Sequence, residues 1–223
     1  MAEKPLTDSI NALTTYINSV TGGEDTNLSD AISTLADGYG GYSIDDLALQ
    51  RIPQGDLVVN TNRIGQGAFA GNTYITSVSG PNVERIDGSA FNGCTKLKSI
   101  DFPNLVSVGG YAFQALPITE VYLPSLQTVE IAGFNRTGMT ILNLPSMTNV
   151  FGQNIFRDCA NLKVVYLASA TTISGRPFYN DTNITDIYLP NAESTYTDAP
   201  WGATNATIHY NTVFDENGEP IIE

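Results

Sequence analysis

The stretch IDGSAFNGCTKLKSIDFP, residues 86–103, decides the fold, because versions of it recur along most of the chain. An aromatic residue that follows a small or conformationally restricted one returns at nearly equal steps, at Phe69, Phe91, Phe113, Phe134, Phe156, Phe178 and Trp201. The steps are 22, 22, 21, 22, 22 and 23 residues. One such repeat cannot bury its apolar face alone, whereas a stack of repeats shares a continuous core. The spacing therefore predicts a repeat solenoid, mainly β, whose aromatic side chains pack on one another from coil to coil.

Each repeat also contains the signature of one short β-strand. An apolar residue stands eight or nine positions after the aromatic, at Val78, Ile100, Val121, Leu142, Val165 and Ile187. Its neighbours alternate between the core and solvent, and a proline ends most of the strands because it has no N–H to continue a ladder. A second apolar pair, such as Leu105 and Val108, precedes the turn to the next aromatic. We expect one strand per coil and a rise of about 4.8 Å per coil.

The rhythm of residues 86–103 resembles the BspA-like class of leucine-rich repeat, and the resemblance extends over roughly residues 60–210. It implies a curved, right-handed solenoid and no reaction. Cys94 and Cys159 fall in the same column of the repeat, three coils and so about 15 Å apart, which is too far for a disulfide. They are predicted to be small buried thiols. The repeats of Phe113 and Phe134 lack this cysteine and have one residue fewer before the strand.

The two ends depart from the repeat. Residues 1–37 predict two short helices, from the apolar stripes Leu6, Ile10, Leu13, Ile17, Val20 and Leu28, Ile32, Leu35. A glycine-rich linker and lead-in over 38–56 and the solenoid over 57–210 are expected to follow. The helical segment resembles the opening of phage and prophage structural proteins, which implies anchoring or homo-oligomerisation; capping of the coil stack is the alternative. Residues 211–223 predict a hairpin that turns at or near Asn217–Gly218 and caps the other end.

The net charge of −13 is concentrated at the ends of the chain. Residues 1–46 hold eight acids and one base, and residues 186–223 hold seven acids and no Lys or Arg, so that the middle has 8 acids (23 − 8 − 7) and 9 bases (10 − 1). An acidic chain repels a phosphate backbone, so we expect no nucleic-acid partner. We also expect no membrane insertion, because no apolar run approaches the length of a membrane span, and the start lacks the apolar core of a secretory signal.

The sequence offers little for catalysis. His209 is the single histidine, so a serine or cysteine triad lacks a second base. Spacings of the C-x-x-C and H-E-x-x-H types, a P-loop and a dinucleotide-binding glycine pattern are missing, and no pair of positioned carboxylates suggests a glycan-cleaving enzyme. We predict a non-enzymatic protein with no catalytic residue, no metal and no cofactor.

The outward positions of the strands form the candidate binding surface. Read across successive coils, they give a strip of polar, aromatic and apolar side chains: Asp101, Glu120, Tyr122, Ile141, Asn143, Val164, Tyr166, Asp186, Tyr188 and His209. Tyrosines flanked by exposed apolar residues are typical of binding surfaces. Structural stacking of the tyrosines between coils is the alternative.

Two hypotheses for function follow. The first is a phage or prophage virion or tail protein that displays the solenoid to a host surface or to a neighbouring virion subunit, and that oligomerises through residues 1–37. The second is a BspA-like adhesin on a bacterial surface or outside the cell, which binds host or microbial proteins. In both, the partner is a protein or a cell-surface macromolecule.

Overall fold

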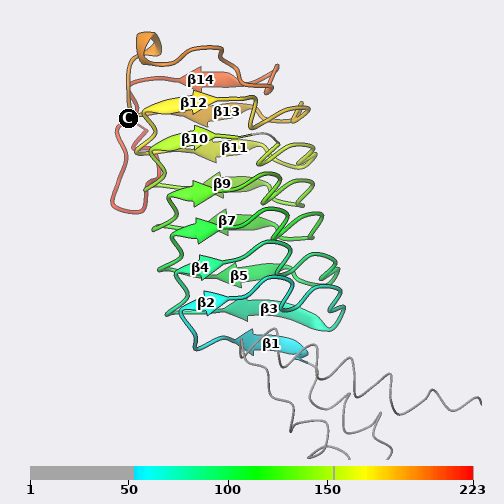
Figure 1. Cartoon of the computed structure of the whole chain (residues 1–223). Helices are drawn as coiled ribbons and strands as arrows, with labels where there is room; N and C mark the ends of the chain where they lie inside the picture. The colour runs from blue at the N-terminus through cyan, green and yellow to red at the C-terminus, as the bar shows by residue number, and fades with distance from the viewer. Residues whose placement is uncertain (1–52, 153, 223) are drawn as a thin grey trace, which may run out of the picture. The chain divides into compact units, whose positions relative to one another are not determined.

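The computed structural model describes residues 53–152 and 154–222, which from Gly55 onward form one compact unit. Parallel strands succeed one another in coils that are stacked in chain order from β1 to β14 (Figure 1). The predicted solenoid is therefore confirmed for the described residues. The helices predicted over 1–37 and nearly all of the lead-in over 38–56 lie outside the described residues.

The first strand of each coil lies on one side of the stack, which we call the strand face. Its strands are β1 (Gly55–Val58), β3 (Ile75–Ser79), β5 (Ser99–Asp101), β7 (Glu120–Tyr122), β9 (Ile141–Asn143), β11 (Val164–Tyr166), β13 (Asp186–Tyr188) and β14 (Thr207–His209). They form two parallel sheets, in the orders β1-β3-β5 and β14-β13-β11-β9-β7. The interruption between β5 and β7 falls at the Phe113 coil, the first of the two coils that are one residue shorter.

A second short strand, of two or three residues, follows in most coils, so the prediction of a single strand per coil was wrong. These strands are β2 (Arg63–Ile64), β4 (Arg85–Ile86), β6 (Ser107–Val108), β8 (Thr128–Val129), β10 (Asn149–Phe151) and β12 (Thr172–Ser174). They pair in the orders β2-β4-β6-β8 and β10-β12. These strands coincide with the second apolar pair of the repeat. One member of each pair, such as Ile86 or Val108, is buried in the core. A 3-10 turn, η1 (Glu193–Thr195), completes the elements.

An aromatic spine runs through the core. The rings of Phe69, Phe91, Phe113, Phe134, Phe156 and Phe178 stack in sequence, with centroid distances of 5.2, 5.4, 5.0, 5.9 and 5.7 Å. From Phe91 to Phe178 these rings are fully buried, and Trp201 is buried one coil further along. The rise from coil to coil places each ring on the next one. A centroid separation of this size is favourable for stacked rings. The predicted continuous core is confirmed.

The predicted thiols are also confirmed. Cys94 and Cys159 are buried and free. Each lies close to the carbonyl oxygen of the aromatic residue one coil earlier, at 3.1 Å from Cys94 Sγ to Phe69 O and 3.3 Å from Cys159 Sγ to Phe134 O. Burial raises the pKa of Cys94 to about 11 and that of Cys159 to about 12. Both therefore remain protonated donors, and thiolate chemistry is suppressed.

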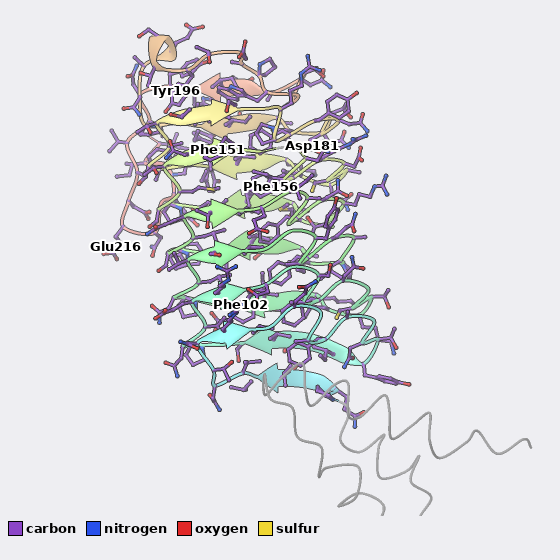
Figure 2. The ribbon with its side chains drawn as sticks, viewed as in Figure 1. Phe102, Phe151, Phe156, Asp181, Tyr196 and Glu216 are labelled. Atoms are coloured by element: carbon purple, nitrogen blue, oxygen red, sulfur yellow. The ribbon has the colours of Figure 1, made fainter. Side chains whose placement is uncertain are left out.

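The C-terminal hairpin forms between residues 213 and 221. Phe214 and Pro220 make an antiparallel bridge, and Asp215 N and Ile221 N donate to Glu219 O and Val213 O. Just before the hairpin, Asn211 N and Thr212 N donate to Asn191 O and Leu189 O near the end of the stack. Asn217 O accepts a hydrogen bond from Asn143 Nδ2 (3.0 Å), at the strand face of a coil in the middle of the stack. Figure 2 shows Glu216 on this hairpin, on the side of the stack away from the turns that hold Asp181.

Candidate binding surface on the strand face

The strand face presents two outward columns of side chains in the register that the sequence predicts. Glu120, Ile141, Val164, Asp186 and Thr207 follow one another in the first column, and Tyr122, Asn143, Tyr166, Tyr188 and His209 in the second. In β3 and β5, Ser77 is paired with Ser99 and Ser79 with Asp101. Alternation along each strand places the residue between the columns in the core, as with Val121 and Leu142. The coils therefore hold both columns on a rigid support.

The ten predicted site residues differ in their exposure. Asp101, Glu120, Tyr122 and Ile141 are exposed, and Val164, Tyr166, Asp186, Tyr188 and His209 are partly buried. Asn143 is only 5% exposed, so the prediction that it lies on an open surface was wrong. The reason is the C-terminal hairpin, whose Asn217 accepts its hydrogen bond and whose Gly218 packs against Pro145.

Beyond Asn143, the second column is an aromatic stack. The rings of Tyr166 and Tyr188 are 5.4 Å apart and tilted by 57°, and Tyr188 lies almost parallel to His209, with centroids 4.2 Å apart. The stacking of these three side chains supports the structural interpretation of this part of the strip. Tyr122 is different, because it is 47% exposed and no stacking partner is recorded for it among the described residues.

The strand face carries negative charge. Its two outward columns, over the strands described, contain acids and no Lys or Arg. Asp186 Oδ1 lies 2.7 Å from His209 Nε2, and this hydrogen bond is the largest cause that holds the pKa of Asp186 below its usual value. Burial, and then the nearby Tyr188, Glu219 and Asp186, raise the pKa of Tyr166. The surface therefore favours groups of positive charge.

A cavity of about 290 Å³ opens between the strand face and the C-terminal hairpin. Its lining comes from β7, from β9 and from the hairpin: Glu120, Val121, Tyr122, Ile141, Asn143, Asn217 and Glu219. Four of the ten predicted residues thus lie together in one concavity. Asp101, Val164, Tyr166, Asp186, Tyr188 and His209 are outside its lining.

Sequence reasoning missed the residues that the hairpin and β1 contribute to this face. Asn217 and Glu219 come from a non-repeating segment, so no column predicted them. Asp56 and Val58 continue the two columns by one coil, beside Ser77 and Ser79. The alternation in GDLV, residues 55–58, was the signal that could have identified them.

A larger cavity of about 830 Å³ lies among the turns of the last coils, and it is lined by Arg176, Tyr179, Asp198 and Trp201 among others. Within residues 53–152 and 154–222, no three acidic, histidine or cysteine side chains gather closely enough to bind a metal ion. In the same part of the chain, no helix has the length and apolar composition needed to cross a membrane.

Comparison with known proteins supports the coil architecture. The family model of the BspA type leucine-rich repeat region matches six copies over residues 85–200. A leucine-rich repeat protein from Bacteroides ovatus is 26% identical, with a TM-score of 0.53 over 60% of this chain and 40% of its own. A leucine-rich cell surface protein from Faecalibacterium prausnitzii is 22% identical, with a TM-score of 0.56 over 73% of this chain and 52% of its own. The chain thus spans about half or less of either protein. No curated protein matches the sequence.

Proposed function

The chain belongs to the BspA-type leucine-rich repeat family, and on that premise we propose that it is a non-enzymatic binding protein that holds a protein partner on its strand face. The observation that carries the proposal is the group of exposed side chains on a rigid sheet, with Tyr122 47% exposed and Ile141 37% exposed next to Glu120. Amphipathic tyrosine beside apolar and acidic groups is typical of protein-binding surfaces. Repeat solenoids in general use extended surfaces of this kind for binding.

The chemistry of the described residues agrees with binding rather than catalysis. His209 is engaged by Asp186 and stacked on Tyr188. Both thiols are buried in the core, beside carbonyl oxygens, with raised pKa values. A base and a nucleophile at hydrogen-bond distance from each other are needed for covalent catalysis, and neither thiol contacts the histidine.

For the setting of the protein, we propose a bacterial surface or the extracellular space. The BspA-like resemblance supports this proposal, because proteins of that type include surface adhesins. The F. prausnitzii protein bears the name of a cell surface protein, but at 22% identity it supports the fold alone.

A virion-associated display protein is the second candidate, and the sequence of residues 1–37 favours it through its resemblance to phage structural proteins. In that case these residues anchor or oligomerise the chain. Light scattering of the full chain and of a chain without residues 1–42 tests this role. Loss of a defined oligomer with an intact solenoid supports anchoring, whereas a monomer in both cases contradicts it. Capsid or tail genes next to the coding sequence would favour the virion.

The strand-face proposal is tested with a random peptide library selected on the full chain. The variant Tyr122→Ser/Tyr166→Ser/Tyr188→Ser removes the three tyrosines of the strand face. Tyr74→Ser/Tyr111→Ser/Tyr179→Ser removes three exposed tyrosines that lie in the turns. We expect the selected peptides to lose binding to the first variant and to retain it with the second. Equal binding to both variants contradicts the proposal, provided that circular dichroism shows both to be folded.

A further inference from the structure

We infer that the cavity between β7, β9 and the C-terminal hairpin is a site for one cationic side chain, a lysine or an arginine, of the partner protein. The inference rests on the proposed function and names the chemistry that the partner brings to the strand face. It follows from the walls of the cavity, from its unpaired acceptors and from its charge.

The walls of the cavity suit a long side chain with an apolar stem and a charged end. Ile141, which is 37% exposed, provides apolar surface, and the exposed ring of Tyr122 also lines the cavity. Lysine and arginine pack their methylene groups on such surfaces while the charged end stays in a polar environment. A cation near the face of a tyrosine ring is attracted to it.

The polar groups of the cavity are acceptors without a cation. Glu120 comes from the strand face and Glu219 from the hairpin, and neither has an ion-pair partner among the described residues. Elsewhere in that part of the chain, acids such as Asp87 and Asp158 are each paired with two arginines. Within the described residues, the two carboxylates therefore have no positive charge to pair with, and a cation of the partner can neutralise them.

Asn143 gives a second, independent indication. It lines the cavity and is 5% exposed, and its Oδ1 is one of only two buried side-chain polar atoms without a hydrogen-bond partner in the described part of the chain. A buried acceptor without a donor destabilises the folded state. Its Nδ2 already donates to Asn217 O. A donor of the partner that enters beneath the hairpin, with a small shift of Gly218, supplies the hydrogen bond that Oδ1 lacks.

The partner is a protein rather than a metal ion. In the part of the chain that the structure describes, no group of three potential ligands comes together here or elsewhere. The apolar side chain of Ile141 would contribute nothing to the binding of a metal ion, whereas it can pack against the stem of a lysine or arginine. Residues 186–223, which include the hairpin, hold seven acids and no Lys or Arg, and this charge attracts a basic partner over a longer range.

Defined peptides test the inference by NMR on the ¹⁵N-labelled full chain. The probes are blocked pentapeptides with lysine, arginine or norleucine between glycines, together with free lysine amide. We expect the cationic peptides to shift the amide signals of Glu120, Tyr122 and Asn217, to bind about tenfold more tightly than the norleucine peptide, and to weaken as salt is added. Equal binding of lysine and norleucine peptides, or shifts away from the cavity, would overturn the inference. Free lysine amide carries the same side chain, so it should shift the same amide signals; no shift from it would mean that the cavity does not recognise the cationic side chain and would overturn the inference.

Matched variants locate the charge. Glu120→Gln/Glu219→Gln removes the two carboxylates of the cavity, and Glu84→Gln/Glu193→Gln makes the same charge change at exposed acids outside it. Only the first variant is expected to lose the preference for lysine over norleucine. The failure of this test is distinguishable from failure of the proposed function: if the selected library peptides still require Tyr122, Tyr166 and Tyr188, the strand face binds a partner without a cationic anchor.

Discussion

At the scale of single residues, the position three residues after the phenylalanine makes hydrogen bonds to backbone groups in four coils, through Cys94, Thr137, Cys159 and Asp181. Cys94 and Cys159 place a thiol near the carbonyl oxygen of the preceding coil's aromatic, and Thr137 donates to Phe134 O within its own coil. Asp181 occupies the same position but accepts from Cys159 N at 2.6 Å, and its Oδ2 is buried without a partner. Burial raises the pKa of Asp181 to about 7.

Asp181 makes the stability of the solenoid depend on pH. Its folded pKa of about 7 lies above its ordinary value of 3.8, so its stabilising contribution is complete below pH 3.8 and is lost as the pH rises through 7. A difference of this size corresponds to roughly 4 kcal/mol. We expect the free energy of unfolding of Asp181→Asn, which keeps an oxygen for Cys159 N but cannot ionise, to increase relative to that of the natural chain as the pH is raised from 5 to 8. Urea unfolding at both pH values measures the difference.

Asp158→Asn is the control for this prediction. The pKa of Asp158 is lowered, first by the hydrogen bond from Asn180 and further by Arg157 and Arg136. Its contribution is present above pH 3.8 and is lost as the pH falls below that value, so the penalty of Asp158→Asn should stay constant between pH 5 and pH 8. If Asp181→Asn also shows a constant difference over that range, Asp181 does not titrate in the folded protein.

At the scale of the element, each turn that carries a phenylalanine of the spine is built from two left-handed residues, two positions before it and two after it. Six coils share this backbone, and the residue is often not glycine: φ is 58° at Ser89, 60° at Tyr111 and 55° at Ala132 before the aromatic. After it, φ is 80° at Gly93 and 58° at Ala115. A left-handed conformation costs an L-residue about 1–2 kcal/mol. The stacked coils impose the turn on sequences that do not favour it.

Ala115→Gly should therefore stabilise the protein. Glycine removes the cost of the positive φ and adds a smaller cost in unfolded-state entropy, and the exposed methyl group of Ala115 contributes little packing. We expect a gain of about 0.5–1 kcal/mol in the free energy of unfolding, measured by urea denaturation. The reverse change, Gly93→Ala, should destabilise, because a Cβ there would lie 3.3 Å from Gly71 Cα at a φ of 80°. A loss of stability in Ala115→Gly would contradict this account of the turn.

The aromatic spine gives a prediction for a single coil with an internal control. Phe156 is fully buried between Phe134 and Phe178, whereas Phe151, five residues earlier, is 63% exposed (Figure 2). Phe156→Ala should cost about 3–5 kcal/mol, through lost burial and a cavity between two rings. Phe151→Ala should stay within about 0.5 kcal/mol. Calorimetric melting of the two variants checks the contrast, and similar losses in both would mean that the rings do not act as a shared core.

At the scale of the whole molecule, the sequence predicts the features that recur from coil to coil and misses those that depend on non-repeating segments. The spine, the outward columns and the buried thiols all follow from a period of about 22 residues, because each coil contacts the next one in the same register. Asn143 and Asn217 are 74 residues apart and belong to no common column. Their contact depends on the path of a non-repeating tail, so neither the burial of Asn143 nor the cavity beside it was predictable from periodicity.

The position of the hairpin on the strand face gives the last prediction. Gly218 has a φ of 75°, and a Cβ there would lie 2.5 Å from Pro145 Cβ and 3.1 Å from Asn143 Oδ1. Gly218→Ala should therefore displace the hairpin, while the spine is left intact. Gly71→Ala is the matched control, because Gly71 has the same φ of 75° and open space around it. We expect a protease specific for glutamate to cut after Glu216 about tenfold faster in Gly218→Ala than in Gly71→Ala, because cleavage follows the population of the open form.

With the hairpin displaced, Asn143 should become accessible to solvent, and the preference for lysine over norleucine peptides should fall, since Glu219 and Asn217 no longer line the cavity. Equal cleavage of the two variants would show that the contact with Pro145 does not hold the hairpin in place.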